Sequence, residues 1–229
     1  MNKKKINLIV VAHPDDEVLG FGGTGASLVK QGQIVQPIIL CGKVKARNRR
    51  PKKSILNENI ISANRYLGFE TPVLGKFPNI RMNTIDHIDI VMFIEKQIYK
   101  FKPSRIFTHH PSDLNDDHIQ ITKACLAASR LFQRQPNFPA LEAIYFMEIL
   151  SSTDWSFSSS KNAFNPDTFS DITETIALKL KALSLYKDVM RPQPHPRSKE
   201  VLKGHAAYRG GQSGYKYAEA FETVFKRKV

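Results

Sequence analysis

Histidine and aspartate side chains gather in two short segments, "AHPDDE" at residues 12–17 and "HHPSDLNDDH" at residues 109–118. His13 and Asp16 are three residues apart, so one turn of chain can present both to a single ion. Zn²⁺ accepts imidazole nitrogen and carboxylate oxygen, and a catalytic zinc site leaves one position for water. His118 is the best candidate for a third ligand. A His₂Asp zinc site suits hydrolysis, although Fe²⁺ or Co²⁺ would accept the same ligands.

The remaining acidic residues beside these candidates need different roles. Asp15 has no ligand role and lies next to Asp16, so we expect it to act as a general base on the attacking water. Asp117, adjacent to His118, is expected to orient a neighbouring donor or a metal ligand. Glu17 would begin the next helix, where the helix dipole favours a carboxylate.

Each of the two segments follows an apolar run that predicts a strand. "INLIVVA" at residues 6–12 is continuously apolar, which is typical of a parallel strand buried on both faces. "SRIFTHH" at residues 104–110 predicts a later strand. In a doubly wound sheet, ligands bind beyond the carboxyl ends of the strands. Both clusters are therefore expected at the same edge of one sheet.

The rest of the pattern alternates between strands and helices. It predicts further strands at 34–41 and 141–149, and helices at 22–32, 54–68, 85–101, 118–132 and 172–190. This alternation predicts a single α/β domain over residues 1–229, with a doubly wound, mostly parallel sheet and a C-terminal extension.

Three local features modify this outline. Pro37 within the strand at 34–41 argues for an edge strand or a bulge. The glycines at 20, 22 and 23 are expected to allow a tight turn and a close backbone approach. Residues 151–170 are rich in Ser, Asn and Pro, which predicts a lid or an excursion that serves an interface, including one between copies of the chain.

The composition of the chain limits the kinds of molecule that it is expected to bind. The chain carries a net charge of +13, and its densest basic run is "KVKARNRRPKK" at residues 43–53. That run has no aromatic residue to stack on bases, and no nucleic-acid-binding motif is present, so nucleic acid is an unlikely partner. The run is expected either to attract an anionic small molecule or to be a solvated loop without a ligand.

No apolar run approaches the roughly 20 residues needed to span a bilayer. The run at residues 6–12 leads straight into charged residues without a cleavage site, so it does not predict a signal peptide. Two cysteines, Cys41 and Cys125, suit a reducing compartment, and we expect both to be buried in a cytoplasmic protein.

Taken together, "AHPDDE" after a first strand, the distal segment ending in "DDH" and the C-terminal "RG…G…YAEAF" resemble the PIG-L/LmbE-like family of zinc-dependent N-deacetylases. The resemblance spans nearly the whole chain. It implies a Rossmann-like fold and hydrolysis of N-acetyl groups from amino sugars, including N-acetylglucosamine conjugates. By position, it implies His13, Asp16 and His118 as zinc ligands. It also implies Asp15 as the general base that later protonates the leaving amine.

One position departs from the family pattern. Many members have a histidine three residues before the last zinc ligand, thought to stabilise the tetrahedral oxyanion, and here that residue is Asn115. Asparagine donates a hydrogen bond but carries no positive charge, and amide donors do serve oxyanions in other enzymes. The alternatives are that His110 or His195 fills this role, or that the zinc ion alone polarises the carbonyl.

Substrate-binding candidates come from polar residues around these motifs: His110, Asp113, His195, Arg197 and Arg209. The prolines around His195 in "RPQPHPRS" fix its backbone, so His195 and Arg197 are expected to line the pocket unless the segment is only a rigid linker. Asp113 is expected to bind sugar hydroxyls or to remain a loop carboxylate. Arg209 is expected either to bind substrate or to pair with Glu219 or Glu222.

The expected activity is removal of the N-acetyl group from an amino sugar or its conjugate, with release of acetate. A sugar carrying a phosphate, nucleotide or carboxylate would suit the basic run. Two other functions stay open: hydrolysis of another amide or an O-acetyl ester at the same metal site, and a non-catalytic binding protein that uses its basic face.

Overall fold

Parallel strands dominate the sheet of this protein. The computed structural model describes residues 4–42, 53–159 and 163–228. Within them lies a seven-stranded sheet of order β3-β2-β1-β4-β5-β7-β6. The strands are β1 (Ile6–Val11), β2 (Ile34–Ile39), β3 (Val73–Leu74), β4 (Arg105–His109), β5 (Ala143–Met147), β6 (Thr168–Asp171) and β7 (Ala218–Lys226). The first five strands are parallel, whereas β7 runs antiparallel to both β5 and β6.

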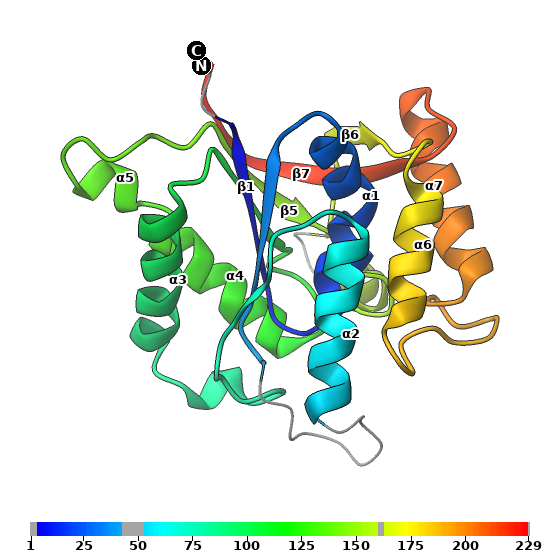
Figure 1. Ribbon diagram of the computed structural model, residues 1–229, viewed down its shortest axis with the longest axis horizontal. Helices are drawn as coiled ribbons and strands as arrows, with labels where there is room; N and C mark the ends of the chain where they lie inside the picture. Colours follow the sequence, from blue (N-terminus) through cyan, green and yellow to red (C-terminus); the bar gives the residue numbers. More distant parts are fainter. Residues whose placement is uncertain (1–3, 43–52, 160–162, 229) are drawn as a thin grey trace.

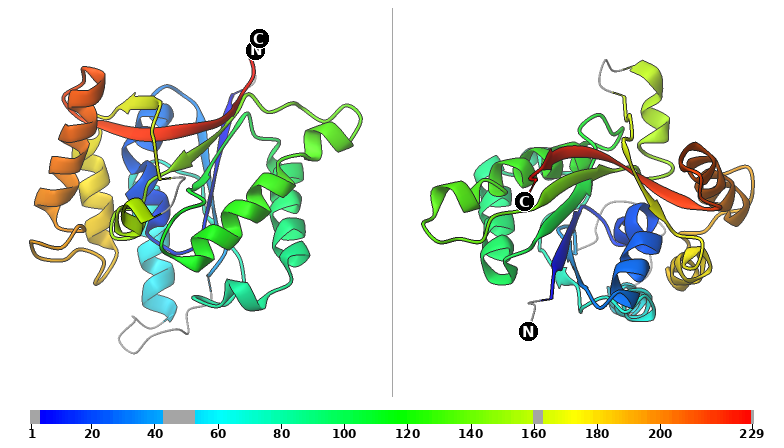
Figure 2. Two further views of the ribbon diagram at one scale, coloured as in Figure 1. Left: turned by 180° about the vertical axis from the view of Figure 1, so that it is seen from behind. Right: turned by 90° about the horizontal axis from the view of Figure 1, so that it is seen from above.

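Helices cover both faces of this sheet. Figure 1 shows α3, α4 and α5 on one face and α1, α2, α6 and α7 on the other, and Figure 2 shows the same layers from behind and from above. The helices are α1 (Asp16–Lys30), α2 (Lys53–Tyr66), α3 (His87–Phe101), α4 (Asp116–Ala128), α5 (Leu131–Arg134), α6 (Ile176–Leu185) and α7 (Lys199–Ser213). The expected doubly wound α/β fold with a mostly parallel sheet is confirmed.

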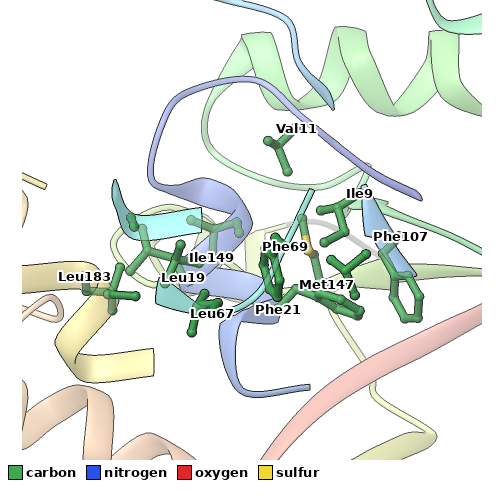
Figure 3. Packing of buried hydrophobic residues seen from close by; sticks show 14 of the residues in the cluster. Ile9, Val11, Leu19, Phe21, Leu67, Phe69, Phe107, Met147, Ile149 and Leu183 are labelled. Atoms are coloured by element: carbon green, nitrogen blue, oxygen red, sulfur yellow. The ribbon is translucent and has the colours of Figure 1, made fainter. Parts of the chain in front are cut away.

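Strand β1 explains why two hydrophobic cores form. Its residues alternate between the faces, so that Ile9 and Val11 join the core beneath α1 and α2 (Figure 3). Leu8 and Val10 join the core beneath α3 and α4. All four side chains have no exposed surface. A strand buried on both faces must be apolar throughout, which is why the sequence shows no polar alternation here.

Several expectations are corrected. Pro37 lies in β2, which is not an edge strand, because β3 pairs with β2 beyond it. Pro37 lies opposite Ile9 of β1, but the N–H groups of Ile34 and Leu40 donate to the β1 side, so the nitrogen of Pro37 faces the β3 side. Proline is tolerated there because β3 pairs only with Ile38 and Ile39. The excursion at 151–170 contributes β6 to the sheet, and the C-terminal segment contributes β7. The strand β7 was not predicted.

Helix α1 begins at Asp16, so the glycines at 20, 22 and 23 lie within it and form no turn. The expected close approach is present, because a Cβ atom on Gly20 would lie 2.7 Å from Met147 Sδ. A buried ion pair between Lys179 of α6 and Glu219 of the "YAEAF" motif lies against α1 and bonds to its backbone. Glu219 accepts the Gly23 and Thr24 amides at 2.9 and 2.7 Å, and Lys179 Nζ lies 2.7 Å from Glu219 Oε1.

The topology brings the two polar segments together. Strands β1 and β4 are parallel neighbours, with Val10 opposite Thr108. The segments that follow their carboxyl ends, beginning at Ala12 and His110, therefore leave the sheet side by side. Among the described residues, no helix combines the length and the apolar character that crossing a membrane requires.

Candidate metal centre

Three buried side chains place one atom each at the corners of a small triangle. His13 Nδ1 and His118 Nε2 are 3.2 Å apart, and Asp16 Oδ2 lies 3.4 Å from the first and 3.2 Å from the second. Tetrahedral zinc with ligand bonds of about 2.0–2.1 Å requires ligand atoms about 3.3 Å from one another. The structure thus brings His13, Asp16 and His118 together with the spacing that a zinc ion requires.

Each histidine of the triangle has a carboxylate on its opposite ring nitrogen. His13 Nε2 lies 2.9 Å from Asp117 Oδ2. His118 Nδ1 lies 3.1 Å from Asp113 Oδ2. Carboxylates in this position fix the ring orientation and raise the basicity of a metal-binding histidine. The two histidines therefore direct His13 Nδ1 and His118 Nε2 at the common centre.

The supporting carboxylates are themselves held in place. Asp117 accepts the backbone N–H groups of Ile80 and Met82, the latter at 2.9 Å. Asp113 accepts the hydroxyls of Ser152 and Thr153 and the backbone N–H of Asn115. These partners use both oxygens of each carboxylate. Asp113 therefore lies behind His118 rather than among groups presented to a ligand.

A second group of donors, His13, Cys41 and Asp117, also has metal-ligand spacing. Burial raises the pKa of the Cys41 thiol, which opposes the thiolate form that binds metal. Cys41 also donates a weak hydrogen bond to the Pro78 carbonyl. The triangle of His13, Asp16 and His118 is therefore the better site. Cys41 and Cys125 are both free and buried, as expected.

The charges around the triangle favour a cation at its centre. Burial lowers the pKa of His118, but the carboxylates of Asp16 and Asp113 outweigh burial and raise it to about 9. Burial raises the pKa of Asp16, and the neighbouring His118 and His13 lower it well below its usual range. The carboxylates of Asp16 and Asp113 would otherwise repel each other, and positive charge between them stabilises both. Either a metal ion or protons on the histidines can provide that charge.

His109, the last residue of β4, supports the same site. Its Nε2 accepts the Ala12 N–H at 2.8 Å, and its ring stacks on that of His118 with centroids 3.7 Å apart. Burial, helped by the charge of His118, lowers the pKa of His109 to about 3, so the ring is neutral. The expected site histidine was His110, because the sequence does not decide which of two consecutive histidines at a strand end faces the site.

Asp15 occupies an unusual backbone conformation at the start of α1, with φ 106° and ψ −29°. Its carboxylate accepts a hydrogen bond from Arg197 Nη1 at 3.0 Å. Its backbone N–H donates to Glu17 Oε2 at 3.0 Å. The side chain of Asp15 is 11% exposed, in contrast to 2% for Asp16. Asp15 is thus a largely buried carboxylate that is more exposed than Asp16 and lies in the chain between two of the candidate metal ligands.

Glu17 has a structural role beyond its favourable interaction with the helix dipole. It is fully buried, and its Oε1 accepts hydrogen bonds from Asn64 Nδ2 at 2.8 Å and from the Tyr186 hydroxyl. Burial raises the pKa of Glu17 to about 7. The network connects α1, α2 and the end of α6 beneath the backbone of Asp15. Its partners are too distant in sequence to be found from local patterns.

Each of the three candidates for oxyanion support already contacts another group of the protein. The Asn115 side chain caps α4, because its Oδ1 accepts the Asp117 N–H at 3.0 Å. His110 lies outside the triangle, with Nε2 3.3 Å from Glu222 Oε2. His195 Nδ1 accepts the Arg197 N–H at 3.0 Å, and its ring contacts Trp155 edge-on.

The two arginines proposed for substrate binding both face carboxylates. Arg209 pairs with Glu148 through Nε at 2.8 Å and Nη2 at 2.7 Å, not with Glu219 or Glu222. Arg197 contacts Asp15, as described above. Sequence reasoning also missed three hydroxyl residues, Ser151, Ser152 and Thr153. They begin the excursion at 151–170 and support the site through Arg197 and Asp113.

A doubly wound sheet with a buried His₂Asp triangle at the carboxyl ends of β1 and β4 defines an α/β protein with a candidate metal site. The sequence matches the family described as PIG-L, GlcNAc-PI de-N-acetylase, over residues 8–129, just over half of the chain. The protein therefore belongs to the PIG-L family. The matched region includes His13, Asp15, Asp16 and His118.

The chain is also similar to three known proteins. The uncharacterized deacetylase YaiS of Escherichia coli (strain K12) is 27% identical over 140 residues, which cover 56% of this chain and 70% of YaiS. The fold also matches N,N'-diacetylchitobiose deacetylase from Pyrococcus horikoshii, with a TM-score of 0.77 at 21% identity over 96% of this chain and 84% of the other.

The third relative is GalB, the 4-carboxy-2-hydroxymuconate hydratase from Pseudomonas putida KT2440. It matches with a TM-score of 0.75 at 20% identity over 98% of each chain. Because this hydratase shares the fold with a deacetylase, the fold alone does not fix the reaction. The choice of reaction depends on the residues of the site.

Proposed function

We propose that this protein is a metal-dependent N-deacetylase that acts on an N-acetylated amino sugar or its conjugate and releases acetate. The observation that carries the proposal is the triangle of His13, Asp16 and His118, whose donor atoms are 3.2–3.4 Å apart. A further carboxylate, that of Asp15, lies in the chain between His13 and Asp16. Membership in the PIG-L family and the deacetylase relatives support the same reaction class.

The proposed metal ligands are His13, Asp16 and His118, with zinc as the preferred ion and Fe²⁺ or Co²⁺ as alternatives. When bound, the ion supplies a Lewis acid for the acetyl carbonyl and for the attacking water. Asp117 and Asp113 keep the two histidine rings oriented from behind.

Asp15 is proposed to take the proton from the attacking water. The resulting hydroxide attacks the acetyl carbon, and the C–N bond breaks. The protonated Asp15 then returns this proton to the leaving amine. The second proton of the water leaves the new carboxyl group and ends on the product amine, so that the products are acetate and an ammonium group.

Support for the oxyanion is assigned to the Asn115 amide. Its Oδ1 is engaged in the helix cap, which leaves Nδ2 as the group that can donate to a substrate oxygen. His110 and His195 are weaker candidates, since each has a ring nitrogen bonded to a neighbouring group. His195 is proposed to line the substrate pocket beside Trp155.

An anionic group on the sugar remains part of the proposal. The basic run at 43–53 on which it depends lies outside the described residues. Equal kcat/KM for neutral and nucleotide-linked sugars, with no effect of salt, would remove this part. The cytoplasmic location and a homo-oligomeric state likewise stay predictions.

The test combines metal content with acetate release. Wild type, His118→Ala and His87→Ala are purified, and zinc, iron and cobalt are measured by elemental analysis. His87 is an exposed histidine on α3 and serves as the matched control. We expect about one ion per chain in wild type and His87→Ala, and loss of the ion in His118→Ala.

The same three proteins are then incubated with N-acetylglucosamine, N,N'-diacetylchitobiose and an O-acetylated sugar of the same ring. Acetate release from the N-acetyl sugars alone supports the proposed reaction. Release from the ester alone would identify an O-acetyl esterase. Strongly salt-dependent binding to generic DNA or RNA by a metal-free wild type would instead favour a basic binding protein.

A further inference from the structure

Asp15 is held at both ends by residues that are distant from each other in the chain. Its backbone N–H donates to Glu17 Oε2, and its carboxylate Oδ2 accepts Arg197 Nη1, each at 3.0 Å. The backbone between these contacts has a φ of 106°, a conformation that a residue with a side chain rarely adopts. Such a conformation persists only when surrounding contacts enforce it.

Arg197 is itself anchored, which makes it suited to hold a partner in place. Its Nε donates to Ser151 Oγ at 2.7 Å, and its backbone N–H donates to His195 Nδ1 at 3.0 Å. The next residue, Ser198, caps α7 by accepting the Val201 N–H at 3.1 Å. The Arg197 side chain is 22% exposed, so its charge is partly shielded from water.

The contacts of the Arg197 guanidinium differ from those expected of a residue that binds an anionic substrate. A guanidinium has donors in a fixed planar arrangement, so fixing Nε on Ser151 also fixes the direction of Nη1. That direction points at the Asp15 carboxylate. A general base works only within hydrogen-bond reach of the proton that it removes, and small displacements of such a group reduce the rate strongly.

We propose that Arg197 is a positioning residue for Asp15, through which the segment before α7 holds the general base in its working orientation. This inference rests on the proposed N-deacetylase function. It changes the expected role of Arg197 from binding the substrate to holding a group of the protein.

The test compares Arg197→Gln, Arg197→Lys and Arg191→Gln with wild type, using acetate release from N-acetylglucosamine and N,N'-diacetylchitobiose. Arg191 is an exposed arginine six residues earlier in the same segment, so it controls for loss of charge. We expect Arg197→Gln to lower kcat by about 10- to 100-fold with KM changed less than twofold and the metal content unchanged. Arg197→Lys keeps the charge without the planar arrangement and is expected to recover part of kcat.

Other outcomes would overturn the inference. A rise in KM with kcat unchanged would return Arg197 to substrate binding. An equal loss in Arg191→Gln would indicate a general effect of charge, and loss of the metal would indicate damage to the site.

A thermal double-mutant cycle tests the pairing without any substrate. We expect Arg197→Gln to lower Tm in wild type and to have a smaller effect in an Asp15→Asn background, because the partner charge is already gone. Equal shifts in both backgrounds would overturn the pairing. If wild type released no acetate from either sugar, the proposed function would fail, while this cycle would still decide whether Arg197 holds Asp15.

Discussion

His13 Nε2 lies 2.9 Å from the Oδ2 atom of Asp117, and this contact turns the other ring nitrogen of His13 toward Asp16 and His118. The Asp117 carboxylate is fixed in turn by two backbone N–H groups of the segment before α3, those of Ile80 and Met82. The chain around residue 80 therefore takes part in orienting a candidate metal ligand that is 67 or more residues away in sequence.

The first prediction follows from this contact. Asp117→Asn replaces the carboxylate with an amide of the same shape, which orients the His13 ring poorly and reduces its basicity. Loss of such a partner typically lowers metal affinity about 10- to 100-fold. Titration with zinc against a chelating competitor would measure the change. Asp116→Asn is the matched control, since Asp116 is the exposed neighbour of Asp117, and equal losses in the two variants would contradict the assigned role.

The second prediction concerns Asp15, the proposed general base. Asp15→Asn keeps the size of the side chain but removes its ability to accept a proton, so kcat should fall by about 10²- to 10⁴-fold. Because Asp15 is not part of the ligand triangle, elemental analysis should find the metal content of wild type. Full deacetylase activity in the variant would remove Asp15 from the mechanism.

The third prediction concerns the buried support of Asp15. Glu17 accepts hydrogen bonds from Asn64, Tyr186 and the Asp15 backbone. Glu17→Gln would turn an N–H₂ group either toward the Asp15 N–H or toward the donors of Asn64 and Tyr186, and we expect a loss of about 1–3 kcal/mol in the free energy of unfolding. Denaturant unfolding would measure it. Glu58→Gln, an exposed change on α2, should have little effect, and equal stability of all three proteins would show that the network contributes little.

The fourth prediction concerns acid stability at a site distant in sequence from the candidate ligands. Burial raises the pKa of Glu148, but His205 and Arg209 outweigh it and hold that pKa below 4.5. The unfolded state therefore binds more protons than the folded state once the pH falls below 4.5. The contacts of Glu148 with His205 and Arg209 stabilise the fold fully above that pH. This stabilisation is lost as the pH falls through the lower pKa that Glu148 has in the folded state.

Arg209→Met should therefore lower the free energy of unfolding at pH 7 by about 1–3 kcal/mol, because it leaves the half-buried Glu148 charge without its bidentate partner. The difference from wild type should shrink as the pH is lowered below 4.5. Thermal unfolding across pH 3–7 would follow it, with the exposed Lys199→Met as control. If the difference in stability between Arg209→Met and wild type did not change with pH, Arg209 would not be a cause of the lowered Glu148 pKa.

The sequence by itself determined the strand and helix alternation and the position of the two His/Asp clusters after β1 and β4. Local periodicity encodes these features, because a strand buried on both faces must be apolar and polar groups must follow its end. The "AHPDDE" segment, the distal segment ending in "DDH" and the C-terminal "YAEAF" together were also sufficient to indicate the family. The expectation of an edge strand at Pro37 was wrong, because a proline in a sequence indicates only that one N–H is missing. It does not indicate how far the neighbouring strand extends.

Only the tertiary structure decided which side chains face one another. The contact between Asp15 and Arg197 joins residues 182 apart, and Glu17 and Tyr186 are 169 apart. The choice between His109 and His110, and between Glu148 and Glu219 as the partner of Arg209, depends on the direction of each backbone bond at the end of a strand. Hydrophobic periodicity fixes the face of an element but not these directions, which are set by packing against distant parts of the chain.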